Sequence, residues 1–257
     1  MKRSRAFLSI LGLLCLVASF ALAGPPAEAA VPRKPITCGM TISTSMNLYL
    51  PRDLACPGSG LTIYSDYDNP DYVPKVNVDL RGHTLSGSGI GQGISAVGFP
   101  FKATLTVSNG RLKNWSLALQ GDTDTRVKGV ALVDNWTAFG CSGYCSADMV
   151  LIKNNEIGVI ATEGEAVVRR STFVGNEVGA TVSYGSVLRV DRSLFLNNRV
   201  GMEGNTAGPQ SASSTFVRNK IAVRVNVEFP EDDPQICAEL TNPRFIRNGR
   251  DVVGPRC

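Results

Sequence analysis

The sequence contains very little histidine and few aromatic residues. His83 is the single histidine among 257 residues, and aromatic side chains make up only 7% of the chain. A Ser-His-Asp or Cys-His catalytic set and a histidine-ligated metal centre are therefore poorly supported. We assign no catalytic residue and no metal ligand, and we expect no cofactor. No segment beyond the N-terminal region keeps a helical hydrophobic period for more than two turns, which favours an all-β protein.

The net positive charge is also small once the N-terminal residues are counted separately. Lys2, Arg3 and Arg5 precede an apolar run over residues 6–23 that ends in Ala21-Leu22-Ala23. This pattern is typical of a secretory signal peptide, which we assign to residues 1–23, although an uncleaved membrane anchor is the alternative. Removal of the signal takes three of the 26 basic residues and leaves 23 against 22 acidic ones. We therefore expect a secreted, extracellular protein that binds neither nucleic acid nor, after signal removal, a membrane.

The cysteines of the sequence indicate disulfide bonds. Six cysteines follow the proposed signal, and an even number in an exported chain indicates disulfides. Six cysteines allow 15 pairings, of which pairing between sequence neighbours is the simplest. A zinc site is disfavoured because the Cys-x3-Cys pair has no histidine or second pair nearby. The expected bonds are Cys38–Cys56, Cys141–Cys145 and Cys237–Cys257.

The chain also repeats itself about every 21 residues. Arg170–Gly179 and Arg192–Gly201 are similar at an offset of 22, and each copy carries an asparagine three residues after a large apolar residue. Short runs of period-two alternation within each copy indicate strands broken by turns. We expect three short strands per copy, parallel stacking of successive copies, and asparagines that occupy turns rather than bind a ligand. These asparagines are Asn114, Asn135, Asn155, Asn176, Asn198, Asn219 and Asn248.

One segment supports a more specific assignment. Val78–Ser86, followed by the glycine-rich Gly87–Gly93, resembles the first coil of secreted bacterial proteins of the right-handed parallel β-helix superfamily, which includes pectate lyases and polygalacturonases. The resemblance implies an all-β, right-handed parallel β-helix, or solenoid, of about eight coils with capped ends. It would cover residues 76–257, including a C-terminal closing segment. Residues 24–35 would then be a mobile stub and residues 36–75 an N-terminal cap. The superfamily has many functions, so the resemblance predicts the fold better than the activity.

The catalytic motifs of the sugar-cleaving members are missing from the sequence. Glycoside hydrolases need a pair of carboxylates, and polygalacturonases place them in aspartate-rich motifs followed by Gly-His-Gly and Arg-x-Lys. The chain has Gly82-His83-Thr84 instead, and no such aspartate motif. One enzymatic alternative stays open, a lyase or epimerase acting on an acidic glycan, with Arg170 and Arg192 gripping the substrate from successive coils.

The residue after each repeat asparagine indicates a binding function. This position reads Trp115, Trp136, Glu156, Glu177, Arg199 and Lys220, so two tryptophans are expected to stack side by side and Glu177 to pair with Arg199. Exposed aromatic pairs bind the apolar faces of sugar rings. Our first hypothesis is a non-catalytic module that contacts polysaccharide through Trp115, Trp136, Arg170 and Arg192. The rings could instead cover the junction with the N-terminal cap. The remaining alternative is a structural or adhesive rod that binds a protein partner, and the oligomeric state stays open.

Overall fold

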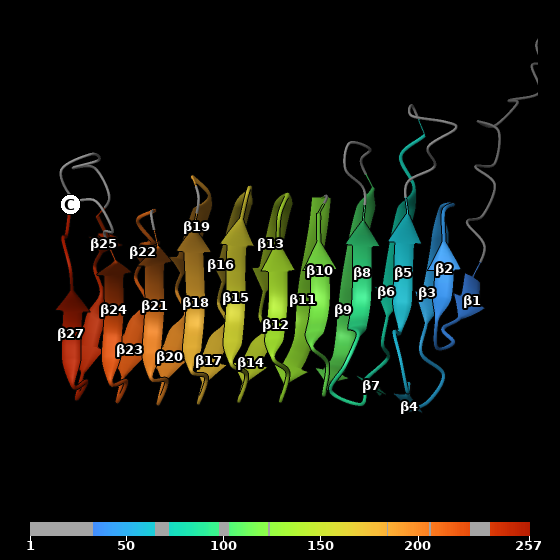
Figure 1. The fold of residues 1–257 in the computed structure, drawn as a ribbon, viewed down its shortest axis with the longest axis horizontal. Helices are drawn as coiled ribbons and strands as arrows, with labels where there is room; N and C mark the ends of the chain where they lie inside the picture. Colours follow the sequence, from blue (N-terminus) through green and yellow to red (C-terminus); the bar gives the residue numbers. More distant parts are fainter. Residues whose placement is uncertain are drawn as a thin grey trace, which may run out of the picture. The chain divides into compact units, whose positions relative to one another are not determined.

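The computed structural model describes residues 33–64, 72–97, 103–122, 124–183, 185–205, 207–226 and 237–257. The proposed signal peptide and residues 24–32 of the proposed stub lie outside this part. The described residues form strands and turns only, in two sheets in which every strand pairing is parallel (Figure 1). No helix in the described ranges has the length and apolar character needed to cross a membrane.

The smaller sheet runs in chain order, as Figure 1 shows, with one strand from each repeat. Its ten strands are β2 (Met40–Ile42), β5 (Leu61–Tyr64), β8 (Gln92–Val97), β10 (Leu117–Gly121), β12 (Thr137–Cys141), β15 (Ile157–Thr162), β18 (Val178–Ser183), β21 (Val200–Asn205), β24 (Ile221–Asn226) and β27 (Arg250–Val253).

The larger sheet has two strips that are joined by the long strands β9 and β11, each of which runs through both. Its 17 strands are β1 (Arg33–Pro35), β3 (Met46–Tyr49), β4 (Leu54–Ala55), β6 (Lys75–Asp79), β7 (Thr84–Ser86), β9 (Thr104–Lys113), β11 (Asp124–Val133), β13 (Tyr144–Asp148), β14 (Leu151–Lys153), β16 (Glu165–Arg169), β17 (Thr172–Val174), β19 (Val187–Asp191), β20 (Leu194–Leu196), β22 (Gln210–Ala212), β23 (Thr215–Val217), β25 (Glu239–Thr241) and β26 (Arg244–Ile246).

Successive repeats therefore stack as a parallel β-solenoid, and each repeat is called a coil below. One coil, for example, consists of β16, β17 and β18, and each of these strands pairs with its counterpart in the next coil, β19, β20 and β21. The prediction of three short parallel strands per repeat is confirmed for this part of the chain. Because the pairing is in register, a residue in one coil lies against its repeat equivalent in the next.

The core is built from like residues stacked on like residues. Phe173, Phe195 and Phe216 are fully buried, and their rings stack with centroids 4.4 and 4.7 Å apart. The same inward position is occupied by Ile152 in the preceding coil and Phe245 in the last. The large apolar residue that recurs in the sequence is thus an interior column that packs along the solenoid axis.

A ladder of asparagines closes the turn between the second and third strand of each coil. The Asn176 side chain is 2% exposed and accepts hydrogen bonds from the backbone N–H and Nδ2 of Asn155, at 2.9 and 3.0 Å. Its own Nδ2 donates to the carbonyl of Ile152 at 3.0 Å and to Oδ1 of Asn198 at 2.9 Å. The pattern repeats from Asn135 to Asn248, so the prediction that these asparagines serve the turns is confirmed.

The first member of the predicted ladder is wrong by one residue. Strand register places Leu117 opposite Thr137, so Trp115, not Asn114, is the equivalent of Asn135. The backbone N–H of Trp115 donates to Asn135 Oδ1 at 3.0 Å, and its indole Nε1 donates to the Leu85 carbonyl at 3.1 Å. The indole therefore makes the carbonyl contact that Nδ2 makes elsewhere. An indole has no acceptor, so the amide ladder stops at this coil.

A second ladder, which the sequence analysis missed, consists of serines at the turn between the first and second strand. Ser171 Oγ accepts from the backbone N–H of Val150 at 3.2 Å, and Ser193 Oγ accepts in the same way from Ser171. Ser214 Oγ accepts from Ser193. Residues just before these serines have positive φ angles, including Arg170 at 50° and Arg192 at 48°. Each turn thus has one inward ladder residue that bonds the next coil, preceded by a residue in the left-handed region.

The cysteines and the chain ends complete the fold. The structure contains the three disulfides that neighbour pairing predicts, Cys38–Cys56, Cys141–Cys145 and Cys237–Cys257. They fit an extracellular protein. The segment proposed as an N-terminal cap contributes strands to both sheets, and residues 33–35 of the proposed stub form β1, paired with β3. At the other end Phe245 continues the interior phenylalanine column and is only partly buried.

Candidate functional site

The two tryptophans do not form the exposed pair that the sequence analysis expects. Trp136 is 64% exposed, whereas Trp115 is 1% exposed and packs in the core. The cause is the one-residue shift in register, which places Ser116 rather than Trp115 opposite Trp136. Gly87 and Gly93 make room for the buried ring, because a Cβ at Gly87 would lie 2.5 Å from it. Trp115 is thus a core residue, and of the two tryptophans only Trp136 offers its ring to solvent.

Trp136 borders a surface hollow of about 570 Å³ that hydrogen-bonding side chains surround. The lining includes Asn114, Asp134, Asn154 and Glu156. Asp134 accepts a hydrogen bond from Asn154 Nδ2 at 3.2 Å and lies 3.5 Å from the ammonium group of Lys113. An exposed indole beside fixed amides and carboxylates can hold a sugar ring, with the indole against its apolar face and the polar groups on its hydroxyls.

These polar groups come from the turn geometry of three successive coils. Asn114, Asp134 and Asn154 each precede a ladder position and have φ angles of 57°, 56° and 55°. In this left-handed conformation the residue lies outside the ladder, while the following residue is the ladder member and points inward. Asparagine and aspartate tolerate this backbone region better than most residues. The hollow therefore presents amide, carboxylate and amide in coil order beside the exposed ring.

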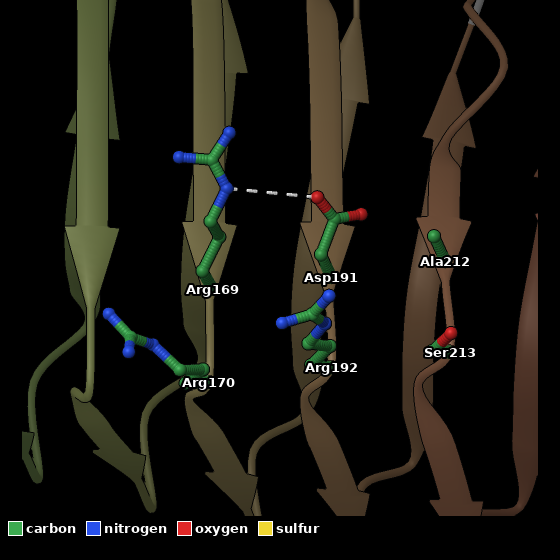
Figure 2. Close-up of a pocket in the computed structure, with 6 residues that line it drawn as sticks. All are labelled: Arg169, Arg170, Asp191, Arg192, Ala212 and Ser213. Atoms are coloured by element: carbon green, nitrogen blue, oxygen red, sulfur yellow. Dashed lines mark ion pairs between the residues drawn. The ribbon is translucent and has the colours of Figure 1, made fainter.

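The predicted basic residues lie at the serine turn, on a different part of the coil. Arg169 ends β16, Arg170 follows it in the turn, and Arg192 is the equivalent of Arg170 one coil later. Figure 2 shows these residues with Asp191, Ala212 and Ser213. Together the six residues line a hollow of about 350 Å³. The structure thus divides the four predicted site residues between two surfaces, with Trp136 on one and Arg170 and Arg192 on the other, and it buries Trp115.

Two of the three arginines at this turn are engaged by aspartates. Arg170 makes a two-point contact with Asp148, in which Nε donates to Oδ1 at 2.8 Å and Nη2 to Oδ2. The hydrogen bond and the negative charge of Asp148 raise the pKa of Arg170 above its usual value. Arg169 Nε lies 3.8 Å from Asp191 Oδ2. Among the described residues, the Arg192 side chain has no carboxylate within ion-pair distance.

A third hollow lies beside the one at Trp136, and its lining includes Arg111, Lys113 and Asn114. Asp53 also lines it, accepts a hydrogen bond from the Thr84 backbone N–H at 2.8 Å, and lies 3.4 Å from Nδ1 of His83. The single histidine therefore sits at a turn beside one aspartate. Within the described ranges no group of three histidine, cysteine or acidic side chains is placed to hold a metal ion.

The sequence analysis missed Asp134, Asn154 and Glu156 as parts of a site. The available signal was their position, because each directly flanks a repeat asparagine and so lies outside the ladder. The expected ion pair between Glu177 and Arg199 is present and confirmed. No protein-family model matches the chain, and no curated protein matches it in sequence.

Proposed function

We propose that the protein is a secreted module that contacts polysaccharide without cleaving it, through the hollow beside Trp136. The observation that carries the proposal is the 64% exposure of Trp136, in a chain whose other tryptophan is buried. Leaving a large aromatic side chain in water gives up roughly 1.5–3 kcal/mol of burial free energy. The polar groups around the ring supply what a sugar ring needs, hydrogen bonds to hydroxyls at the edge of an aromatic platform.

We also propose the finer description of the fold as a right-handed, pectate-lyase-like parallel β-helix of bacterial origin, with about eight coils over residues 76–257. Right-handedness is supported by the strong preference of parallel crossover connections for that hand. Secretion is supported by the signal-like N-terminus and by the three disulfides, which persist in oxidising compartments.

The proposal is tested by titrating the protein lacking residues 1–23 with a panel of neutral and acidic polysaccharides while tryptophan fluorescence is followed. We expect a saturable spectral shift with at least one glycan. Trp136→Ala should weaken that binding by about tenfold, which corresponds to about 1.4 kcal/mol. Because the variant loses the reporter, its affinity is measured by calorimetry alongside the parent protein.

Tyr144→Ala is the matched control, since Tyr144 is another exposed aromatic residue, at 57%, outside the hollow. Its affinity should equal that of the parent protein. Equal affinities for the parent and Trp136→Ala would overturn the proposal, as would the absence of binding to every glycan. Chain cleavage during the titrations would instead support the lyase alternative.

A further inference from the structure

The serine turn carries an uncompensated positive charge. Three arginines, Arg169, Arg170 and Arg192, face two aspartates, Asp148 and Asp191. Asp148 is taken up by the two-point contact with Arg170, and Asp191 is the nearest carboxylate to Arg169. Among the described residues of this turn, the guanidinium of Arg192 is the one without a carboxylate within ion-pair distance.

The column in which Arg192 stands explains why it has no acidic neighbour. Equivalent turn residues in successive coils are Met149, Arg170, Arg192, Ser213 and Asn242, and the backbone N–H of each of the first four donates to the carbonyl of the residue just before its equivalent in the next coil. Arg192 is therefore flanked by another arginine on one side and by a serine on the other. Neither flanking residue supplies negative charge, and the Arg170 guanidinium adds like charge.

The next coil leaves space at this point. Opposite Asp191 stands Ala212, and opposite Arg192 stands Ser213, so two small side chains follow a coil of long charged ones. Figure 2 shows Asp191 and Arg192 on the middle of three coils, between Arg169 and Arg170 on one side and Ala212 and Ser213 on the other, and these six residues line the hollow. The lining thus combines guanidinium donors and the Ser213 hydroxyl with one carboxylate, that of Asp191, which lies near Arg169.

We propose that this hollow binds a tetrahedral oxyanion, a phosphate or sulfate group, with the Arg192 guanidinium as its main ligand. Arg169 and Ser213 would supply further donors from neighbouring positions. A planar carboxylate is matched by one guanidinium, as the Asp148–Arg170 contact illustrates, whereas a tetrahedral group can accept from donors on two coils at once. The site goes beyond the glycan contact proposed above and does not depend on Trp136.

The first experiment titrates inorganic phosphate and inorganic sulfate into the nitrogen-15-labelled protein and follows the arginine Nε–H signals by NMR. We expect saturable shifts of the Arg192 signal with either ion. Arg192→Asn should weaken binding by about tenfold or more, because a hydrogen bond to a charged group is lost. Asparagine is chosen because it tolerates the left-handed backbone of this position, where φ is 48°.

Arg218→Asn is the matched control, since Arg218 is also exposed, has a φ of 54°, and stands at the other turn. It should leave the affinity unchanged. Equal weakening by both substitutions would show general charge attraction and would overturn the proposal, as would unsaturable shifts. Ala212→Glu, which adds a carboxylate to the hollow, should abolish binding, and retained binding would refute this location.

A second experiment distinguishes the source of the oxyanion by comparing dextran sulfate, polyphosphate, polygalacturonate and neutral dextran. If the sulfated or phosphorylated polymer binds through Arg192 with higher affinity than the free ion does, the site is assigned to an ester or a polymer. Equal affinity per group would assign it to the free ion, and both results support the site. Tighter Arg192-dependent binding of polygalacturonate would overturn the tetrahedral assignment. Trp136→Ala should leave every one of these Arg192-dependent signals unchanged.

Discussion

Replacing one asparagine of the buried ladder should destabilise the protein far more than replacing the last one. In Asn176→Ala, four hydrogen bonds of 2.9–3.0 Å are lost at once. The backbone N–H of Asn155 loses its side-chain acceptor in a buried site, which costs about 1–3 kcal/mol. The three other bonds contribute about 0.5–1 kcal/mol each. The expected loss is therefore about 2.5–6 kcal/mol.

This loss is a large fraction of the free energy of unfolding of a typical domain, which is about 5–15 kcal/mol. For a chain of this length it should lower Tm by roughly 5–24 °C. Neither Asn176 nor Asn248 has a positive φ angle, so alanine introduces no backbone strain at either position. Asn248 makes the same contacts to Asn219, at 2.9 and 3.1 Å, but is only partly buried. Water can replace those bonds, so Asn248→Ala should cost about 1 kcal/mol.

The assay is equilibrium unfolding in guanidinium chloride with the disulfides intact, followed by circular dichroism and by tryptophan fluorescence. Stacked repeats can unfold in parts, so free energies are compared only if the two probes give the same transition. Where they differ, the temperature midpoint of each probe is compared instead. Equal losses for Asn176→Ala and Asn248→Ala would refute the reasoning, because the argument depends on burial and not on the number of bonds.

Three further outcomes follow from the packing, the surface charges and the disulfides. Phe195→Ala removes the central ring of the interior column and should cost about 3–5 kcal/mol, whereas Phe245→Ala, at the partly exposed end, should cost less than half as much by the same unfolding assay. Glu177→Ala breaks the surface pair with Arg199 and should cost under about 1 kcal/mol, a difference that should disappear in high salt; a larger or salt-independent loss would contradict this. Replacing both cysteines of Cys38–Cys56, which are 18 residues apart, should cost about 3 kcal/mol by loop entropy, and an unchanged denaturation midpoint would contradict it.

Repetition made most of the fold predictable from the sequence. In-register stacking requires like residues at like positions, so the spacing of Phe173, Phe195 and Phe216 and of the asparagines indicated the strands, the core and the turn ladder together. The failure came where the pattern changes. Trp115 replaces the ladder asparagine, and Asn114 beside it satisfied the pattern by identity alone. The indole could not be recognised as a ladder residue because its contact to the Leu85 carbonyl is a property of the folded coil.

The candidate sites were less predictable because they depend on which neighbours surround each residue. Arg170 and Arg192 are equivalent in the repeat, yet one is held by Asp148 and the other is free of any described carboxylate. That difference comes from the preceding coil, which supplies an aspartate to one, and from the following coil, which supplies only Ala212 and Ser213 to the other. Repeat alignment treats both arginines alike, whereas three-dimensional packing distinguishes them.

The two ladders also explain why the candidate sites lie at the turns. The inward asparagines and serines bond each turn to the next coil, so the residue beside each of them points outward and takes no part in either ladder. Trp136 directly follows a ladder asparagine, and Arg192 directly precedes a ladder serine. Substitutions at such positions leave both ladders and the interior column intact. A loss of binding in Trp136→Ala or Arg192→Asn, with an unchanged unfolding transition, therefore reports a lost contact with the ligand rather than a damaged fold.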